Sequence, residues 1–310
     1  MKIIFFGLGS IGKRHARILL EKYKHDLYAF RSGTREKGNE LNIPEVYSWE
    51  EVDAIKPDIA FVTNPTSMHV DVAIACAQMG MHLFIEKPLD SEIEDLGKLL
   101  KIVSKKKLAT YVAYVLRFHP VVVRLKKYCE KQKPLHMRVA CSSYLPKWHP
   151  RRDVSKRYSS HKKMGGGVIY DLSHEIDYVE YILGDIMRIK GQFAQRSDIT
   201  VDVEDYADIL VETKKGPANI HINFFSHVNE RKVQIDFKDR YIEGDLLKNT
   251  VTEYREGQKR KTVEYKGDIS TCFEKQIRYF LKNLNNPNMM NSIFEGEGLI
   301  RKIYRFKNGK

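Results

Sequence analysis

The sequence predicts an α/β protein, with an N-terminal doubly wound parallel sheet and a C-terminal α+β domain whose open sheet is largely antiparallel. Three observations lead to this fold class. Residues 2–12 read as an apolar strand running into a glycine-rich turn, the first third of the chain alternates strand-like and helix-like segments, and later β-like runs have hairpin-length connections. A chain of 310 residues is long enough for two domains, which we place at residues 1–119 and 120–310.

The first third of the chain has the alternation of strands and helices that is typical of a parallel sheet. Apolar runs predict strands at residues 2–6, 27–30, 59–63, 82–85 and 109–114. Helical periodicity predicts helices at residues 11–23, 49–55, 68–79 and 91–104. Ligands of such sheets bind at the carboxyl ends of the strands, so functional residues are expected there.

After residue 120 the pattern changes to that of an α+β domain. We expect a helix, a strand, an aromatic-rich loop and a second helix, in that order, at residues 121–131, 136–144, 145–160 and 168–183. Further strands are expected at residues 188–195, 206–213, 219–226, 233–237, 241–244 and 251–254, and closing helices at 271–283 and 291–306. Short connections such as residues 214–217 favour antiparallel pairing.

The turn after the first strand has the spacing G-x-G-x-x-G, at Gly7, Gly9 and Gly12. In a Rossmann domain the first glycine permits a tight turn, the second lets the backbone approach a pyrophosphate, and the third lets the helix pack on its strand. The free N–H groups of the following helix, which starts near Ser10 and Ile11, then face the anion. The flanking strand and helix favour a dinucleotide site over a plain glycine-rich turn.

The end of the second strand indicates which dinucleotide is preferred. NAD-binding domains place Asp or Glu there against the ribose 2′-hydroxyl, whereas this chain has Arg31 followed by Ser32. A guanidinium pairs with a 2′-phosphate, and the serine hydroxyl can donate a further hydrogen bond. The pattern favours NADP over NAD, and NAD stays open because strand ends read from sequence are uncertain by a few residues.

A lysine follows the fourth strand, in the segment Phe-Ile-Glu-Lys-Pro at residues 84–88. At the carboxyl end of a strand, the Lys87 ammonium would lie close to the nicotinamide ring, where it could stabilise an alkoxide or donate a proton. The alternative is a surface lysine in a turn, because the residue before a proline commonly ends a strand.

Residues 165–177, GGGVIYDLSHEID, combine glycines with titratable side chains on a predicted helix. Spacings of three place Asp171, His174 and Asp177 along one face, while Leu172 and Ile176 are available for the core. Histidine changes its protonation state near neutral pH, and a carboxylate one turn away can fix its tautomer. Taken alone, a histidine on a helix is more often structural than catalytic.

These three segments together resemble the Gfo/Idh/MocA oxidoreductases, named for glucose-fructose oxidoreductase, inositol dehydrogenase and rhizopine catabolism. The resemblance covers essentially the whole chain. It includes a loop that the family places by the nicotinamide and a segment at its domain junction. The further residues that carry it are Thr63, Asn64, Pro65, His69, Glu86 and Arg117.

The resemblance implies a function for several of these residues. Lys87 corresponds to the catalytic lysine, His174 to the acid/base histidine and Asp171 to its accompanying carboxylate, with Asp177 in a supporting role. Family members commonly place this aspartate four residues before the histidine, whereas here it stands three residues before it, so Asp171 departs from the pattern. The residues of the 63–69 loop and Glu86 would lie by the cofactor and Arg117 by the substrate.

The resemblance also implies features of the fold and assembly. The open sheet would line the substrate cleft with one face and make subunit contacts with the other, in a homodimer or homotetramer. Lys87 and His174 would converge on the nicotinamide from separate domains. The Lys87–Pro88 bond is expected to be cis, as it often is in relatives.

The loop after the strand at 136–144 points to the substrate class. Aromatic rings suit the apolar face of a sugar, and arginines suit phosphate or carboxylate groups. The loop also resembles that of relatives associated with making unusual cell-surface sugars, and this resemblance implies a sugar nucleotide or an acidic sugar for cell-surface glycans as the leading substrate class. A loop packed at a subunit interface is the alternative. The candidate residues are Tyr144, Trp148, Arg151, Arg152 and Tyr158.

Composition excludes several other classes of protein. The formal charge of +13 comes from lysines and arginines scattered over the whole chain, which argues against nucleic-acid and membrane partners. The four cysteines are widely separated, so neither a disulfide framework nor a metal site is expected. No apolar run approaches the length of a membrane helix or a secretory segment, and we expect a cytoplasmic protein.

The function predicted from the sequence is reversible hydride transfer between NADP(H) and a sugar-like carbinol or ketone. In the reducing direction His174 or Lys87 would supply the proton, and in the oxidising direction the same group would act as the base. Two alternatives stay open: an NADP-binding sensor or scaffold without turnover, and elimination or hydrolysis through transient oxidation.

Overall fold

The computed structural model describes residues 1–33, 38–148 and 153–309, which form two compact units. The first unit comprises Met1–Tyr114 and Phe273–Tyr304, and the second comprises Val115–Cys272 and Arg305–Lys310. The division after Tyr114 lies close to the expected boundary at residue 119. The C-terminal part of the chain differs from the expected division, because Phe273–Tyr304, which includes most of the last two helices, belongs to the N-terminal unit.

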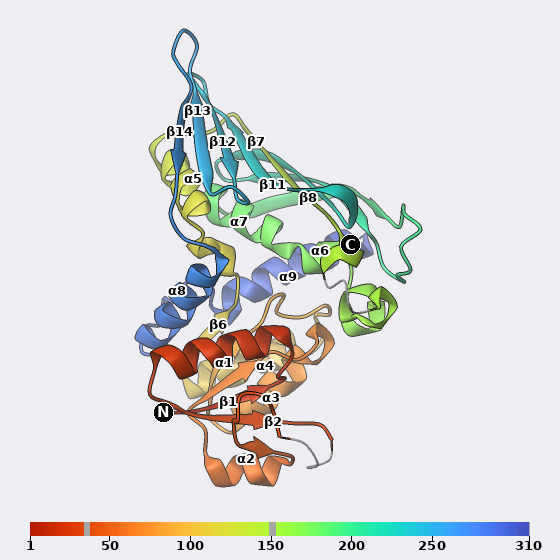
Figure 1. The fold of residues 1–310 in the computed structure, drawn as a ribbon, viewed down its shortest axis with the longest axis vertical. Helices are drawn as coiled ribbons and strands as arrows, with labels where there is room; N and C mark the ends of the chain where they lie inside the picture. The colour runs from red at the N-terminus through yellow and green to blue at the C-terminus, as the bar shows by residue number, and fades with distance from the viewer. Residues whose placement is uncertain (34–37, 149–152, 310) are drawn as a thin grey trace. The chain divides into compact units, whose positions relative to one another are not determined.

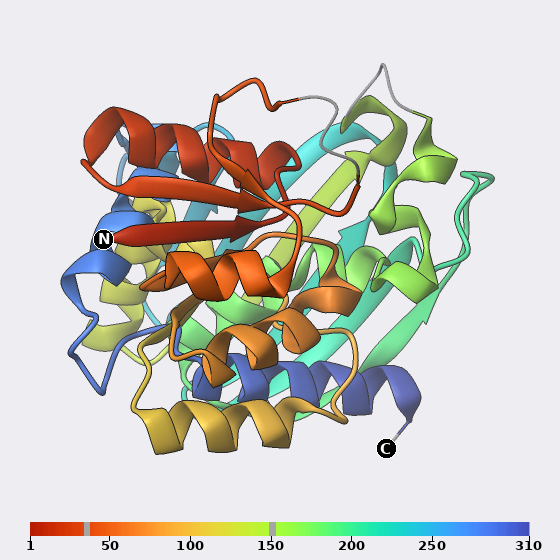
Figure 2. The same cartoon turned by 90° about the horizontal axis from the view of Figure 1, so that it is seen from below.

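The first unit contains a six-stranded sheet whose strands are all parallel (Figure 2). The strand order is β3-β2-β1-β4-β5-β6, which confirms the doubly wound prediction. The strands are β1 (Lys2–Phe6), β2 (Asp26–Phe30), β3 (Glu45–Val46), β4 (Ile59–Val62), β5 (His82–Ile85) and β6 (Thr110–Val112). The sequence did not predict β3, since two residues are too few for a periodicity.

Helices connect these strands close to where the sequence predicts them. One start differs: the helix expected at residue 91 begins at Leu96, because Asp90 accepts the backbone N–H groups of Ser91 and Glu92 and so stabilises a turn there. The helices of the unit are α1 (Ser10–Lys22), α2 (Trp49–Ile55), η1 (Thr66–Met68), α3 (His69–Gln78), α4 (Leu96–Lys106), α8 (Ile269–Lys282) and α9 (Ile293–Asn308).

A row of aromatic rings crosses one face of the parallel sheet. Phe5, Phe61, Phe84 and Tyr111 occupy paired positions on β1, β4, β5 and β6. Neighbouring ring centroids lie 4.9, 4.4 and 5.2 Å apart. All four side chains are fully buried, so the row supplies much of the hydrophobic core of this unit.

Two helices cover this aromatic row. Phe280 of α8 packs edge-on against Phe84 at 5.5 Å, and His15 of α1 packs against the same ring at 5.0 Å. On the opposite face of the sheet, Phe6 and Phe30 stack with Trp49 of α2. The alternation of Phe5 and Phe6 thus gives each face of the sheet its own aromatic cluster.

The second unit contains an eight-stranded sheet in the order β14-β13-β12-β11-β7-β10-β9-β8. Figure 1 shows this sheet with α5 (Pro120–Lys131) and α7 (Ser173–Leu183) beside it. All neighbours pair antiparallel except β7 and β10, which confirms the prediction of a largely antiparallel sheet. The strands are β7 (His136–Tyr144), β8 (Ile186–Ala194), β9 (Tyr206–Thr213), β10 (Gly216–Asn223), β11 (Phe225–Asp236), β12 (Tyr241–Asp245), β13 (Thr250–Tyr254) and β14 (Lys261–Glu264).

Two strands of this sheet differ from the sequence prediction. β11 includes residues 226–232, which are polar apart from the exposed Val228, and its register shifts between Phe225 and Glu230, so the apolar alternation that marks a strand is interrupted there. β14 has only exposed side chains and therefore carries no buried face for the sequence to reveal.

Helices pack on one face of the second sheet. Gly244 of β12 allows close contact with α5, since a Cβ at this position would lie 2.7 Å from a methyl group of Val121. The helix expected at residues 168–183 is interrupted at Leu172, so it is observed as two helices. The helical segments of this unit are η2 (Val115–Phe118), α5 (Pro120–Lys131), η3 (Leu145–Trp148), η4 (Val154–Lys156), η5 (Tyr158–Ser160), η6 (Lys162–Met164), α6 (Val168–Asp171) and α7 (Ser173–Leu183).

Within the described ranges, no helix combines the length and the apolarity needed to cross a lipid bilayer.

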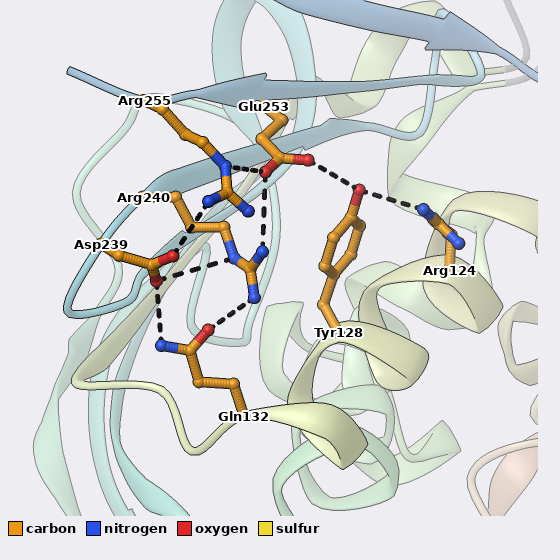
Figure 3. Close-up of polar contacts among 7 residues, drawn as sticks. All are labelled: Arg124, Tyr128, Gln132, Asp239, Arg240, Glu253 and Arg255. Carbon is orange, nitrogen blue, oxygen red and sulfur yellow. Dashed lines mark hydrogen bonds and ion pairs between the residues drawn. The ribbon is translucent and has the colours of Figure 1, made fainter. Parts of the chain in front are cut away.

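A charged cluster joins α5 to the neighbouring strands of the second unit (Figure 3). Glu253 accepts hydrogen bonds from Arg255 at 2.7 Å and from the Tyr128 hydroxyl at 3.2 Å. The guanidinium of Arg240 lies 3.6 Å from the same carboxylate and donates to Gln132 at 2.5 Å. Burial acts to raise the pKa of Glu253, but these hydrogen bonds and guanidinium charges outweigh it and hold that pKa below its usual range. The cluster comprises Arg124, Tyr128, Gln132, Asp239, Arg240, Glu253 and Arg255.

We predict that Glu253→Gln lowers the free energy of unfolding by about 1–2 kcal/mol at pH 7, because a charged acceptor of two hydrogen bonds is lost. A carboxyl whose folded-state pKa is depressed contributes stability above its ordinary pKa and loses it as the pH falls through the folded-state value. The difference between the two proteins should therefore shrink towards pH 3. Urea unfolding at pH 7 and pH 3 measures this, with the exposed Glu256→Gln as the matched control. Equal stability of wild type and Glu253→Gln at pH 7 would contradict the prediction.

Candidate nucleotide site and catalytic residues

The glycine turn after β1 has the shape that a dinucleotide requires. Gly7 has φ +103°, and a Cβ there would lie 2.7 Å from the backbone nitrogen of Asn64. A Cβ at Gly12 would lie 2.2 Å from the Gly7 carbonyl oxygen. A Cβ at Gly9, in contrast, would meet no atom within 4 Å. Two glycines are thus required by packing, while the third leaves open space beside the backbone.

The start of α1 offers backbone N–H donors next to that space. The helix spans Ser10–Lys22, no side chain caps its first turn, and that turn contains no acidic residue. Backbone N–H groups at a helix start carry partial positive charge and bind phosphate groups. The residues around Gly9, Ser10 and Ile11 therefore fit the diphosphate of a dinucleotide.

The loop after β4 is joined directly to the glycine turn. The Thr63 hydroxyl donates to the Gly7 carbonyl at 2.5 Å, and the Thr63 N–H donates to the Phe6 carbonyl at 2.9 Å. Pro65 precedes η1, and the next helix, α3, begins at His69. The predicted cofactor residues of this loop therefore lie beside the glycine turn, within the same unit.

His69 links the loop after β4 to the loop after β5. Its Nδ1 lies 2.9 Å from the Pro88 carbonyl and its Nε2 lies 2.9 Å from the Asn64 carbonyl. The side chain is almost fully buried, and burial lowers the pKa of this histidine although both carbonyl groups act in the opposite direction. The ring ties the two loops together inside the protein.

Lys87 follows β5 at the same edge of the sheet. It is half-buried, its backbone N–H donates to Glu86 Oε2 at 3.2 Å, and the Lys87–Pro88 bond is cis, as expected. The other Glu86 oxygen lies 2.7 Å from Nε2 of His15. The residues on both sides of Lys87 are therefore held by buried histidines: Glu86 by His15, and Pro88 by His69.

Arg31 lies at the carboxyl end of β2, where the sequence placed it, and its side chain is 39% exposed. Its Nε lies 3.8 Å from Glu45 of β3, the strand that the sequence did not predict. The carboxylate of Glu45 also accepts from Tyr47 at 2.5 Å and Asn39 at 2.9 Å, and these bonds and the Arg31 charge hold its pKa below the usual range. Ser32 is exposed beside Arg31.

In the second unit, two ion pairs anchor α7. Glu175 is fully buried and accepts from Arg231 of β11 at 2.7 Å. Asp177 is also fully buried and accepts from Arg117, whose closest nitrogen lies at 2.7 Å. His174 immediately precedes Glu175 in sequence and is half-buried. Arg117, predicted to contact substrate, is only 7% exposed, and its guanidinium is bonded to Asp177.

Asp171 is buried and ends α6, one residue before the interruption at Leu172. The expectation that one regular helix carries Asp171, His174 and Asp177 on a single face is therefore wrong for Asp171. The glycines before α6 allow close packing: a Cβ at Gly166 would lie 2.4 Å from the Tyr158 carbonyl oxygen. The turn at 165–167 thus lies directly against the loop that carries Tyr158.

The predicted substrate loop contains aromatic side chains at the surface of the second unit. Tyr144 packs against His227 with ring centroids 4.3 Å apart. Trp148 donates from its indole nitrogen to Ser143 at 2.9 Å and is 36% exposed, and Tyr158 is 39% exposed. The predicted residues Arg151 and Arg152 lie outside the described residues.

Over residues 1–33, 38–148 and 153–309, no three side chains of the metal-binding types gather into a group. The four cysteines are free and buried, and burial raises the pKa of Cys129 and of Cys141 to about 12.

Comparison with known proteins identifies the family. A family model described as the oxidoreductase family with an NAD-binding Rossmann fold matches residues 1–114. A model of the GFO/IDH/MocA C-terminal domain matches residues 133–243. The chain therefore belongs to the Gfo/Idh/MocA oxidoreductases, as its motifs predicted, and it is an enzyme of this oxidoreductase family, whose N-terminal domain is an NAD-binding Rossmann fold.

Individual relatives are dehydrogenases of sugar-like compounds. The myo-inositol 2-dehydrogenase of Thermotoga maritima is 26% identical over 237 residues, which cover 71% of this chain and 67% of that protein. The UDP-N-acetylglucosamine 3-dehydrogenase of Acidithiobacillus ferrooxidans is 25% identical over 276 residues, covering 83% and 78%. The structure of an inositol dehydrogenase homolog from Azotobacter vinelandii, complexed with NAD+, shares the fold with a TM-score of 0.82 at 15% identity, covering 98% of this chain and 94% of that one.

Two residues of the nucleotide region were not predicted as functional. In the sequence, His15 was only part of the helical pattern of residues 11–23. The signal that could have identified it is a titratable side chain at a position of the helix that faces the core. Glu45 lies on the short strand β3 and had no periodicity to mark it. Each becomes recognisable only through its partner, Glu86 and Arg31 respectively.

We predict that Gly9→Ala separates dinucleotide binding from folding. The added Cβ meets no protein atom, so the melting temperature without cofactor should stay close to that of wild type, while the affinity for the dinucleotide falls about tenfold or more because the diphosphate can no longer approach the backbone. Titration calorimetry and thermal unfolding measure the two effects. Gly12→Ala is the matched comparison and should destabilise the protein by about 1–3 kcal/mol through its clash with Gly7. Unchanged affinity in Gly9→Ala would argue against the site.

Proposed function

We propose that this enzyme catalyses reversible hydride transfer between NADP(H) and a ring carbinol or ketone of a sugar-like substrate. The observation that carries the proposal is the edge of the first sheet, where the glycine turn after β1, the Thr63 loop after β4 and Lys87 after β5 are joined by hydrogen bonds. The bound nicotinamide would supply or accept the hydride. The protein's own residues must bind the dinucleotide, orient the substrate and move one proton.

Lys87 is proposed to act on the oxygen of the reacting carbon. An ammonium group stabilises a developing alkoxide and can donate a proton to it. His174, on the doubly anchored helix α7, is proposed as the acid/base group, with Asp171 as the carboxylate that accompanies it. In the oxidising direction the neutral imidazole takes the hydroxyl proton, and in the reducing direction the imidazolium returns it.

The substrate is proposed to be a sugar, sugar nucleotide or inositol-like polyol. Support comes from the relatives, which are named for inositol and for UDP-N-acetylglucosamine. Tyr144, Trp148 and Tyr158 offer exposed or half-exposed rings that suit the apolar face of a sugar. The charge partner of a phosphate or carboxylate would be Arg151 or Arg152.

Subunit contacts are proposed for the outer face of the second sheet. Helices pack on the other face, and the outer face carries the exposed apolar side chain of Leu210, which is 57% exposed. It also carries a hollow lined by Arg138, Gln192, Asp208, Asn219, His221 and Lys232. A homodimer or homotetramer would cover this surface.

NADP is proposed as the preferred dinucleotide because of Arg31. Replacing this arginine should therefore change the cofactor preference of the enzyme. Arg31→Ala should weaken NADP+ binding about 10- to 100-fold, the value of one charge-assisted contact, and leave NAD+ binding nearly unchanged. Dissociation constants measured by calorimetry for both dinucleotides test this. The exposed Arg278→Ala is the control. Wild type that binds NAD+ as tightly as NADP+, or a variant that loses both equally, would contradict the NADP assignment.

The catalytic assignment predicts a loss of turnover without a loss of cofactor. Lys87→Met and His174→Gln should each lower kcat by about 100-fold or more, with the dissociation constant for the dinucleotide within a few-fold of wild type. Absorbance at the nicotinamide band, followed over a panel of inositols, hexoses, hexuronates and UDP-sugars, measures turnover. Lys98→Met, an exposed lysine on α4, is the control. Normal turnover by Lys87→Met would remove Lys87 from the mechanism.

A further inference from the structure

His15 and Glu86 form a buried polar pair that the proposed mechanism does not use. Nε2 of His15 lies 2.7 Å from Oε1 of Glu86, although the two residues are 71 positions apart in sequence. His15 is fully buried and Glu86 is 8% exposed. Because an ionised carboxylate only accepts hydrogen bonds, the Nε2 atom carries the proton and donates it to Glu86.

The surroundings of His15 are apolar. Its ring centroid lies 5.0 Å from that of Phe84, 5.5 Å from that of Phe273 and 5.8 Å from that of Phe61. Its second nitrogen, Nδ1, has no hydrogen-bond partner among the described residues. A buried polar side chain costs free energy that an apolar one of similar size avoids, so packing alone does not account for a histidine here.

The second oxygen of Glu86 connects the pair to Lys87. Oε2 accepts the backbone N–H of Lys87 at 3.2 Å, while the backbone N–H of Glu86 itself donates to the Val62 carbonyl of β4 at 2.9 Å. On the other side of Lys87, the carbonyl of Pro88 is held by His69 at 2.9 Å. The segment 86–88 is therefore held by one buried histidine on each side.

We propose that His15 and Glu86 are a positioning pair for Lys87. The imidazole orients the Glu86 carboxylate, and the carboxylate fixes the backbone from which the Lys87 side chain extends. Neither residue touches the substrate in this proposal. It rests on the proposed function only for the effect on turnover, because the effect on the order of the 86–88 backbone can be measured without a substrate.

The test compares two substitutions of His15 that differ in one hydrogen bond. His15→Gln keeps an N–H donor towards Glu86, whereas His15→Leu fills the apolar site without a donor. We expect His15→Leu to lower kcat about tenfold or more with KM and cofactor affinity within about threefold, and His15→Gln to keep most of the activity, since small misplacements of a catalytic group reduce rate and not binding.

A second measurement does not depend on turnover. Hydrogen–deuterium exchange, read by mass spectrometry on peptides that cover residues 84–91, should be faster in His15→Leu than in wild type or His15→Gln. A purely structural role predicts instead that faster exchange spreads over α1 and the strands of the aromatic row. If His15→Leu does not fold, Glu86→Leu replaces it, because a leucine side chain has no acceptor for the Lys87 N–H.

The control is His82→Leu, at the opposite end of β5. His82 accepts the backbone N–H of Ala109 at 2.9 Å, so this variant loses a histidine hydrogen bond on the same strand and should change neither kcat nor exchange at 84–91. The positioning role is overturned if His15→Leu matches His15→Gln in exchange, or in turnover where wild type is active. If the wild-type protein turns over no compound of the panel, the proposed function fails. The positioning role of His15 is then tested by hydrogen–deuterium exchange at residues 84–91 alone.

Discussion

The in-register parallel pairing of β1, β4 and β5 is the constraint on which the nucleotide region depends. Phe6 pairs with Val62, and Val62 pairs with Ile85, so the next residue of each strand lies in one row. That row contains Gly7, Thr63 and Glu86, from segments of the chain more than 20 residues apart. A shift of a single residue in either pairing would turn alternate side chains to the wrong face and separate these three positions. The register of the strands therefore determines which residues meet at this edge of the sheet.

The aromatic row holds that register in place. Rings at paired positions on four neighbouring strands stack only when the strands are aligned, so packing and hydrogen bonding select the same pairing. Phe280 and His15 cover the row from α8 and α1. The same core thus fixes the strand ends and presents His15 to Glu86, which places a polar contact for the Lys87 segment at the edge of an apolar cluster.

Sequence reasoning predicted the parts of this fold that have a strong local signal. The strand at 2–6 and the helix at 49–55 have the observed bounds because apolar pattern and chain turns agree there. β3 and β14 were missed for opposite reasons, the first being too short and the second having no buried face. The interruption at Leu172 was missed because both halves have helical periodicity, and only their packing separates them.

The candidate site shows the same division between local and long-range information. Glycine spacing and the Lys-Pro sequence are local signals, so Gly7, Gly12 and Lys87 could be singled out from sequence alone. Pairings such as Arg31 with Glu45 and Arg117 with Asp177 depend on the tertiary fold, and no spacing rule reveals them. They change how the residues are interpreted: Arg117, isolated in sequence, has a carboxylate partner within its own unit, whereas Arg31 keeps a substantially exposed guanidinium.

Buried carboxylates have different partners in the two units. In the second unit, Glu175 and Asp177 are fully buried and each has an arginine partner, so α7 is fixed to β11 and to the η2 segment by paired charges. In the first unit, the buried carboxylate of Glu86 has a histidine and a backbone N–H as partners. Full ion pairs anchor an element rigidly but are costly to desolvate, whereas a histidine–carboxylate pair orients its neighbour with less buried charge. The first arrangement suits a helix that carries the proposed acid/base residue His174, and the second suits a short segment that carries the proposed catalytic residue Lys87.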